Sequence, residues 1–195
     1  LIEERIYSIA AALTLEVGKN RMEALGETQE TADFFRGYAD EFERSGAFDH
    51  PLPNDPIANV ISRNRSVMKP YGVWVVIAPF NFPLALAGGP VAAALITGNT
   101  VVLKGSSATP WAGRLLADCI RDAGLPAGVF NYLGGSSGAI GAALVEHPLA
   151  AGATFTGSHA VGMGILRTMQ SGAYPRPCIT EMGGKNACIV TASAD

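Results

Sequence analysis

Two polar side chains directly follow apolar segments and could support catalysis. Asn81 lies in the segment 79–83, which reads Pro-Phe-Asn-Phe-Pro and follows the apolar run 73–78. A side-chain amide in a partly desolvated pocket can donate hydrogen bonds to a developing oxyanion. Glu181 precedes two glycines that allow close backbone approach, so it is a candidate general base. The alternatives are a turn asparagine and an exposed glutamate at a strand end.

Two further features suit a ribose or a phosphate. Lys104 ends the long uncharged stretch 70–103 and could reach ribose hydroxyls or a phosphate. The segment 157–162 reads Gly-Ser-His-Ala-Val-Gly, and free N–H groups in such a turn before a helix suit a pyrophosphate, with the Ser158 hydroxyl as an added donor. It matches neither the G-x-G-x-x-G fingerprint nor a P-loop. The alternative for Lys104 is a lysine that only marks the return of the chain to the solvent-exposed surface. The alternative for the segment 157–162 is a turn that binds no ligand.

These residues need a scaffold that brings strand ends together. The run 73–78 is apolar on both faces, which is typical of a strand in the middle of a parallel sheet covered by helices. From residue 72 onward the pattern alternates, and this predicts an α/β fold with a doubly wound parallel sheet. Ligands bind at the carboxyl ends of the strands in such sheets. The expected strands are 73–78, 100–103, 129–133, 153–155, 178–180 and 187–190, and the expected helices are 84–97, 110–123, 139–146 and 161–169.

The first 68 residues follow a different pattern. Apolar spacing predicts two amphipathic helices, over 3–19 and 28–44, with Thr28 as a possible cap of the second. Residues 45–55 are predicted to form a loop. The segment 57–68 alternates in part, as an exposed or edge strand pair would, and does not fit a βα series. The second helix carries an aromatic stripe that we expect in the core: Phe34, Phe35, Tyr38 and Phe42.

Composition excludes several classes of function. The chain has 195 residues, 48% hydrophobic and 16% charged, as one folded domain would. A net charge of −3 does not favour nucleic acid or an anionic membrane as a partner. Prolines and glycines interrupt the stretch 70–103, so a transmembrane helix is not expected. Three cysteines without metal-ligand spacing indicate reduced thiols in a cytoplasmic protein and no metal site.

Five segments in register then point to a family. Residues 78–83 read Ala-Pro-Phe-Asn-Phe-Pro, 98–104 read Gly-Asn-Thr-Val-Val-Leu-Lys, and 124–131 read Gly-Leu-Pro-Ala-Gly-Val-Phe-Asn. Residues 155–158 read Phe-Thr-Gly-Ser, and 181–185 read Glu-Met-Gly-Gly-Lys. Together they resemble the aldehyde dehydrogenase superfamily, with Phe80 where that family usually has Trp. The resemblance covers about residues 70 to 190 well and the N-terminal helices loosely.

The resemblance implies NAD(P)-dependent oxidation of an aldehyde substrate to an acid in a Rossmann-like cofactor-binding domain. In the family a cysteine thiolate attacks the aldehyde, hydride passes to the nicotinamide, and water hydrolyses the thioester. Asn81 would then stabilise the oxyanion, and Glu181 would activate the nucleophile or the deacylating water. Lys104 would contact ribose hydroxyls, Ser158 the pyrophosphate and Gly128 the adenine. The implied cofactor residues are Ala78, Pro79, Phe80, Lys104, Ser107, Gly128, Gly157, Ser158 and Gly162.

The sequence departs from the family in two places. The family nucleophile lies farther beyond the glutamate than the few residues that follow Glu181, and we interpret Cys178 and Cys188 as packing thiols. Residues 1–195 are therefore expected to be the cofactor-binding part of a longer enzyme, without its catalytic domain and inactive alone. Ser107 stands where many relatives have a glutamate that holds the ribose and repels a 2′-phosphate, so NAD is preferred and NADP stays open.

Substrate and assembly rest on finer similarity. The segment 176–186 and the Phe-Asn-Phe variant are most similar to the 1-pyrroline-5-carboxylate (glutamate-semialdehyde) dehydrogenase branch, an activity of proline catabolism. The segment 57–68 corresponds to part of an oligomerisation arm in the family, which implies a homo-oligomer.

Two other classes remain open. The segment 134–138 fits the G-x-S-x-G nucleophile elbow, so Ser136 could serve a serine hydrolase. No Asp lies between Ser136 and the later histidines His147 and His159, which disfavours that alternative. The non-enzymatic alternative is an isolated cofactor-binding fragment or pseudoenzyme.

Overall fold

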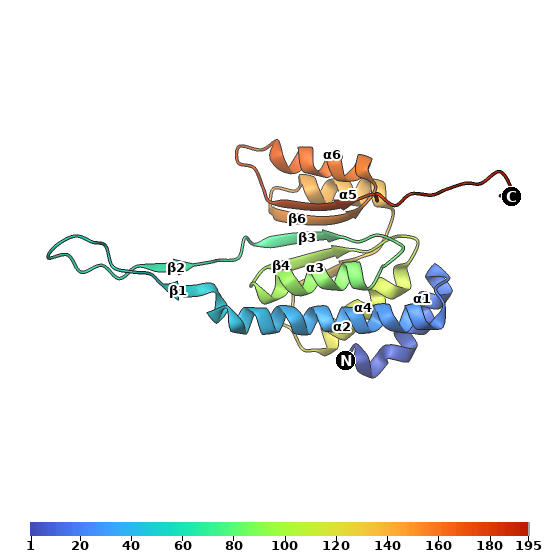
Figure 1. Cartoon of the computed structure of the whole chain (residues 1–195), viewed down its shortest axis with the longest axis horizontal. Helices are drawn as coiled ribbons and strands as arrows, with labels where there is room; N and C mark the ends of the chain where they lie inside the picture. The colour runs from blue at the N-terminus through green and yellow to red at the C-terminus, as the bar shows by residue number, and fades with distance from the viewer. Residues whose placement is uncertain (195) are drawn as a thin grey trace.

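A five-stranded parallel sheet forms the centre of the protein, and the computed structural model describes residues 1–194 of it (Figure 1). The strand order is β5-β4-β3-β6-β7, and every neighbouring pair is parallel. The chain starts the sheet at β3, builds outward to β5, and then returns to the other side of β3. The predicted doubly wound α/β fold is confirmed. The strands are β3 (Val73–Ile77), β4 (Thr100–Lys104), β5 (Phe130–Leu133), β6 (Ala150–Gly157) and β7 (Cys178–Met182).

Helices cover both faces of this sheet (Figure 1). One face carries α3 (Ala85–Ile96) and α4 (Pro110–Asp122), with α1 (Ile6–Val17) and α2 (Arg21–Arg44) packed outside them. The other face carries α5 (Ser137–Glu146) and α6 (His159–Gln170). The core accordingly divides into a larger cluster on the first face and a smaller one on the second.

The uncharged stretch 70–103 forms β3, α3 and most of β4, at the middle of the molecule. Val75 and Val76 are each 1% exposed, as expected for a strand that is covered on both faces. Within residues 1–194, no helix is both long enough and apolar enough to cross a membrane. The apolar composition of the stretch matches the burial of β3 at the sheet centre.

The helix α2 starts earlier than predicted. α2 begins at Arg21, so the prediction that Thr28 caps it is wrong. Asn20 caps it instead, in a capping box in which its side chain accepts from the Glu23 backbone and the Glu23 carboxylate accepts from the Asn20 backbone. Thr28 lies buried in the helix, where its hydroxyl donates to the Ala24 carbonyl. A short 3-10 turn, η1 (Glu3–Arg5), precedes α1, which ends at Gly18 with φ of 80°.

The aromatic stripe of α2 is only partly in the core. Phe34 and Phe35 are half-buried against Gly88 and Gly89 of α3, because these glycines let the two helices approach closely. Tyr38 is 38% exposed.

Residues 45–68 form a protruding antiparallel ribbon (Figure 1). After η2 (Gly46–Phe48), the strand β1 (Asp49–Pro51) pairs with β2 (Arg65–Val67). The predicted loop 45–55 thus contains a strand. The segment 57–68 contributes one strand rather than a pair, and its partner lies outside it.

The end of the chain also differs from the prediction. Residues 187–190 form no strand, and within residues 183–194 there is neither helix nor strand. Ile189 and Val190 are 85% and 77% exposed, because no neighbouring strand pairs with them. β6 begins at Ala150 and α6 at His159, both earlier than expected. Asp195, the last residue of the predicted domain, lies outside the described residues.

Candidate functional site

A cleft of about 1280 Å³ opens at the carboxyl ends of β3, β4, β6 and β7. It lies beside the point where the strand order reverses, between β3 and β6, where doubly wound sheets bind ligands. Its remaining walls come from α5 and α6. Eight predicted site residues line the cleft: Ala78, Pro79, Phe80, Asn81, Lys104, Gly157, Ser158 and Glu181.

Asn81 lies in the short loop between β3 and α3. The Ala78 N–H donates to the Lys104 carbonyl at 3.2 Å, so the loop leaves the sheet only after Ala78. Pro83 and Leu84 are buried on the far side of the loop, whereas Phe80 is 62% exposed. Asn81 is exposed between these two anchors and lines the cleft. Its amide is thus available to a ligand.

Lys104 is the last residue of β4 and is only 1% exposed. Burial lowers the pKa of its ammonium group, because the charged form loses hydration. Ser106 also lines the cleft, and the exposed Ser107 comes directly after it. The β4–α4 loop therefore brings a buried cation and hydroxyl groups to the same rim.

Ser158 caps α6 at the cleft, where its hydroxyl oxygen accepts from the Val161 N–H at 3.5 Å. The N-terminus of a helix favours an anion, because its first N–H groups lack intrahelical partners. Gly162 in the first turn does not line the cleft. A Cβ there would overlap the Met182 side chain, so this glycine packs α6 against the sheet.

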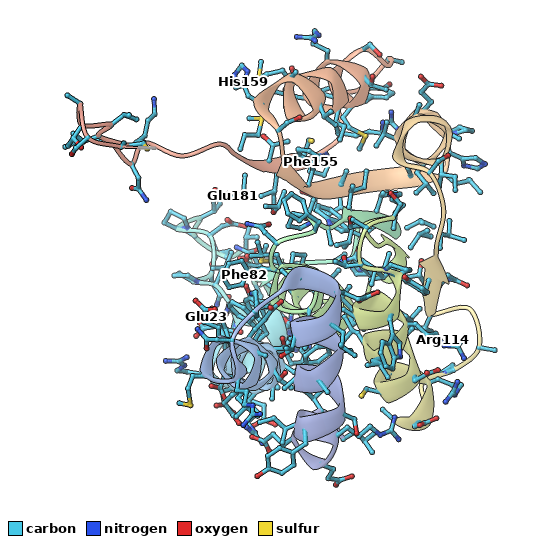
Figure 2. All side chains as sticks on the ribbon, turned by 90° about the vertical axis from the view of Figure 1, so that its right-hand side faces the viewer. Glu23, Phe82, Arg114, Phe155, His159 and Glu181 are labelled. Atoms are coloured by element: carbon cyan, nitrogen blue, oxygen red, sulfur yellow. The ribbon has the colours of Figure 1, made fainter. Side chains whose placement is uncertain are left out.

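Glu181 lies near the end of β7, paired in register with Thr156 of β6. Its side chain is exposed and lines the cleft. Figure 2 looks along the sheet from the cleft side and draws Glu181 between Phe155 and Phe82. The carboxylate and the Asn81 loop thus line one cleft from the ends of β7 and β3.

The sequence analysis missed the helical walls of the cleft. Gly138, Gly141 and Ala142 of α5 occupy one helix face at spacings of three and four residues. This spacing of small residues is visible in the sequence and could have predicted the α5 wall. At Gly141 and Gly164, no atom apart from the adjacent residues and the backbone of the same helix lies within 4 Å of the place where a Cβ would be. These walls leave room for a flat ring. The apolar wall of α6 consists of Val161, Ile165 and the stem of Thr168.

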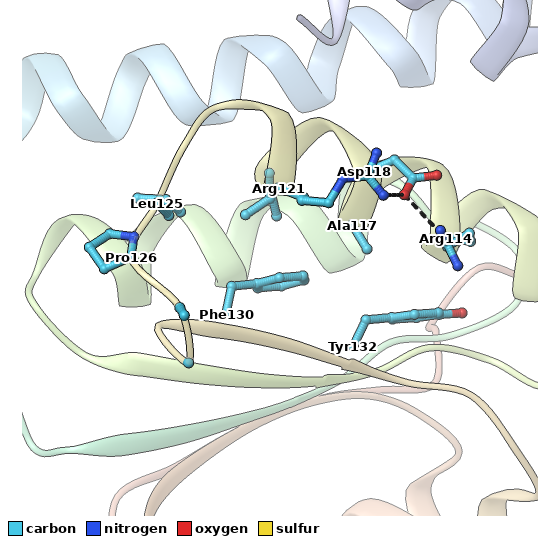
Figure 3. A pocket seen from close by; sticks show the side chains of 11 residues that line it. Arg114, Ala117, Asp118, Arg121, Leu125, Pro126, Phe130 and Tyr132 are labelled. Atoms are coloured by element: carbon cyan, nitrogen blue, oxygen red, sulfur yellow. Dashed lines mark hydrogen bonds and ion pairs between the residues drawn. The ribbon is translucent and has the colours of Figure 1, made fainter.

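Gly128 does not line this cleft. It precedes β5 with φ of 84° and borders a separate depression of about 340 Å³ between α4 and β5 (Figure 3). Because it lies at the amino end of β5, it is at the opposite edge of the sheet from Lys104. The predicted contact of Gly128 with adenine is not supported by this position.

The other candidate nucleophiles lack the expected geometry. Ser136 has φ of −62° and ψ of 138°, which is ordinary extended backbone rather than the strained turn of a nucleophile elbow. Cys178 on β7 is half-buried against the smaller core cluster, and burial raises the pKa of its thiol. A nucleophilic cysteine needs a lowered thiol pKa. Cys119 of α4 is buried, and its thiol pKa is also raised by burial. Cys188 is exposed, so the prediction that it is a packing thiol is wrong.

Comparison with known proteins agrees with this architecture. The sequence model of the aldehyde dehydrogenase family matches residues 1–195. The chain belongs to the aldehyde dehydrogenase family. It is 40% identical over 201 residues to 1-pyrroline-5-carboxylate dehydrogenase of Geobacillus thermodenitrificans and 39% identical over 204 residues to that of Anoxybacillus flavithermus. Each match covers 100% of this chain and 38% of the relative.

Solved structures of similar sequence show the same fold. A bifunctional proline utilization A protein superposes with a TM-score of 0.86 at 38% identity, over 94% of this chain and 18% of that protein. An NADP-dependent glyceraldehyde-3-phosphate dehydrogenase from Bacillus halodurans, complexed with NADP, superposes with a TM-score of 0.84 at 36% identity. That match covers 95% of this chain and 38% of that enzyme. The predicted resemblance and the Rossmann-like fold are confirmed.

Proposed function

We propose that this chain is the cofactor-binding part of an NAD(P)-dependent aldehyde dehydrogenase that oxidises glutamate semialdehyde to its acid. The main support for this proposal is the cleft, which brings Asn81, Lys104, Ser158 and Glu181 together at one edge of the sheet. The relatives named 1-pyrroline-5-carboxylate dehydrogenase support the substrate.

The residues present fit a dinucleotide. Lys104 and the serines after it would hold ribose hydroxyls, and Ser158 with the first turn of α6 would hold the pyrophosphate. The open faces of Gly141 and Gly164 leave space for the adenine between α5 and α6. When bound, the nicotinamide group accepts a hydride. The protein's own part is to hold the cofactor and to keep the reacting end beside Asn81 and Glu181.

Two groups of this chain would act on the reacting atoms. The Asn81 amide donates a hydrogen bond to the oxygen on which negative charge develops, and such a preorganised donor contributes about 3–4 kcal/mol. Glu181 accepts a proton from the attacking nucleophile or from the water that releases the product. We place the nucleophilic cysteine outside residues 1–195, because burial raises the thiol pKa of Cys119 and Cys178. The exposed Cys188 does not line the cleft. The purified 195-residue chain should then show no aldehyde oxidation, and NAD-dependent turnover would contradict this.

The substitution Glu181→Gln in the full-length protein tests the proposal. It should lower kcat by about 100-fold to 10,000-fold, since general base catalysis contributes that range. Cofactor affinity, measured by fluorescence titration, should not change. Glu30→Gln, the same chemical change at an exposed site of α2, is the matched control. Near-normal turnover of Glu181→Gln would contradict the proposed role of Glu181 as the general base.

Cofactor preference depends on Ser107, which is exposed one residue beyond the cleft residue Ser106. Without a carboxylate at this position, nothing there repels a 2′-phosphate, so we prefer NAD but expect weak discrimination. Ser107→Glu should weaken NADP binding by about tenfold while NAD binding is retained, because like charges at close range are unfavourable. Parallel titrations of both cofactors measure this. An unchanged NADP affinity would place the 2′-phosphate elsewhere.

The ribbon of residues 45–68 is proposed to pair protomers in a homo-oligomer. It projects from the body of the protein (Figure 1). Its large apolar side chains are exposed. Exposed apolar groups of this kind mark interaction surfaces. These side chains are Leu52, Ile57, Val60, Ile61, Val67 and Met68.

A further inference from the structure

A buried carboxylate from α2 caps the helix that follows Asn81. Glu27 is 2% exposed, and its Oε1 atom accepts hydrogen bonds from the backbone N–H groups of Leu84 at 2.9 Å and Ala85 at 3.1 Å. No side chain at the start of α3 itself forms a capping bond. Glu27 therefore satisfies donors that the helix leaves unpaired, and its charge complements the helix dipole.

Lys19 links Glu27 to the aromatic ring of Phe82 in the loop before α3. Its Nζ atom lies 2.5 Å from Glu27 Oε2 and 3.2 Å from the centroid of the Phe82 ring. Lys19 is 9% exposed, whereas Phe82 is 41% exposed, so burial of the ammonium group strengthens this cation–π contact although the ring is partly in solvent. The pair holds Phe82 through the ammonium group and Leu84 through the carboxylate. Asn81 is the residue immediately before these two contacts.

The neighbouring loop is held in the same manner. Glu16 of α1 accepts from the backbone N–H groups of Trp111 and Ala112, both at 2.7 Å, at the start of α4. That helix follows the loop after Lys104. The two N-terminal helices thus each place one carboxylate on a helix start, and each of those helices follows a cleft loop.

We infer that Glu27 and Lys19 are positioning residues, which fix the direction of the Asn81 amide through the first turn of α3 and the Phe82 ring. This rests on the proposed role of Asn81 as the oxyanion donor. A buried ion pair gives little net stability compared with apolar residues of similar volume. An amide donor, by contrast, loses its effect when it is displaced by about 1 Å, which can lower the rate about a hundredfold.

The test compares two double variants, because Glu27→Leu alone leaves the Lys19 ammonium buried without its partner and can prevent folding. Lys19→Met/Glu27→Gln removes both charges but keeps an oxygen that can accept from Leu84 and Ala85. Lys19→Met/Glu27→Leu removes that acceptor as well. Methionine retains an apolar contact with the ring of Phe82 in both variants. The difference between them isolates the cap.

In the full-length protein, kcat of Lys19→Met/Glu27→Leu should be about a hundredfold below that of Lys19→Met/Glu27→Gln, with the KM for NAD the same. Adding Asn81→Ala to each should abolish the difference, because coupled residues are not additive. In the 195-residue chain, amide hydrogen exchange at Leu84 and Ala85 should be faster in the Leu variant only.

Equal kcat values for the two double variants would overturn the inference, and so would a loss that adds fully to that of Asn81→Ala. A purely structural role predicts the second result, since a general loss of stability does not depend on Asn81. Normal turnover of Asn81→Ala alone in the wild-type background would instead overturn the proposed role of Asn81. The two failures are thereby distinguishable.

Discussion

The two sides of the cleft are built differently. On the side of β3 and β4, the helices that follow Asn81 and Lys104 each begin on a carboxylate from α1 or α2, the half-buried Glu16 or the buried Glu27, above the larger core cluster. On the side of β6 and β7, Glu181 is exposed and the smaller core cluster supports the strand. Ile179 of β7 is 56% exposed. This chain therefore fixes the proposed oxyanion and ribose groups through its own packing, whereas it leaves the proposed base, Glu181, exposed.

The largest expected contrast between the two sides is in stability. Glu27→Leu should lower the free energy of unfolding by about 3–5 kcal/mol, because it leaves the buried ammonium of Lys19 without its partner. Glu181→Gln should change it by less than about 0.5 kcal/mol, as is usual for an exposed side chain. Urea denaturation of the 195-residue chain measures both. Similar losses for the two variants would show that the β7 side is as tightly constrained as the α2–α3 side.

Glycine substitutions sharpen the same contrast. A Cβ on Gly88 of α3 would lie 2.5 Å from Thr31 Cγ2, in the buried contact with α2. Gly88→Ala should therefore cost about 1–3 kcal/mol of stability, as overpacked cores do. Gly164→Ala meets open space in α6 and should raise stability by about 1 kcal/mol, the difference in helix propensity.

Thermal and urea unfolding of both glycine variants, with cofactor titration, would test this contrast. Gly164 lines the cleft, so the added methyl group should also weaken cofactor binding even as it stabilises the fold. If Gly88→Ala were as stable as wild type, α2 and α3 would have room to separate, and the tight packing behind Asn81 would be refuted.

The sequence allowed the sheet and much of the cleft to be predicted, because apolar runs of strand length end where the site residues begin. Asn81, Lys104 and Glu181 follow from this local rule together with the convergence of parallel strand ends. Glu27 does not, since its partners at the start of α3 are 57 and 58 residues away and its charge gives no local sign of burial. The apolar run 187–190 failed as a strand for the converse reason, because a strand needs a partner that local sequence cannot supply.

The smallest effect concerns Glu3, an exposed carboxylate of η1 that contacts α2. Hydrogen bonds from Arg36 and Gln29 lower the pKa of Glu3 from 4.5 to about 2. Because the unfolded chain then binds a proton more readily than the folded one, this contact stabilises the fold above about pH 4.5, and its contribution is lost as the pH falls towards about 2. Glu3→Gln should thus be slightly less stable than wild type near neutral pH, with a difference that vanishes in acid.

Urea unfolding of both proteins from about pH 6 down to about pH 2 measures this difference. Solvent screens the exposed pair of Glu3 and Arg36, so its effect should stay well below that of Glu27, although both carboxylates contact a cation. A difference that stayed constant with pH would mean that the contact depends on the shape of the side chain rather than on its charge. In that case the difference in burial between Glu3 and Glu27 would not explain why the two carboxylates contribute differently to stability.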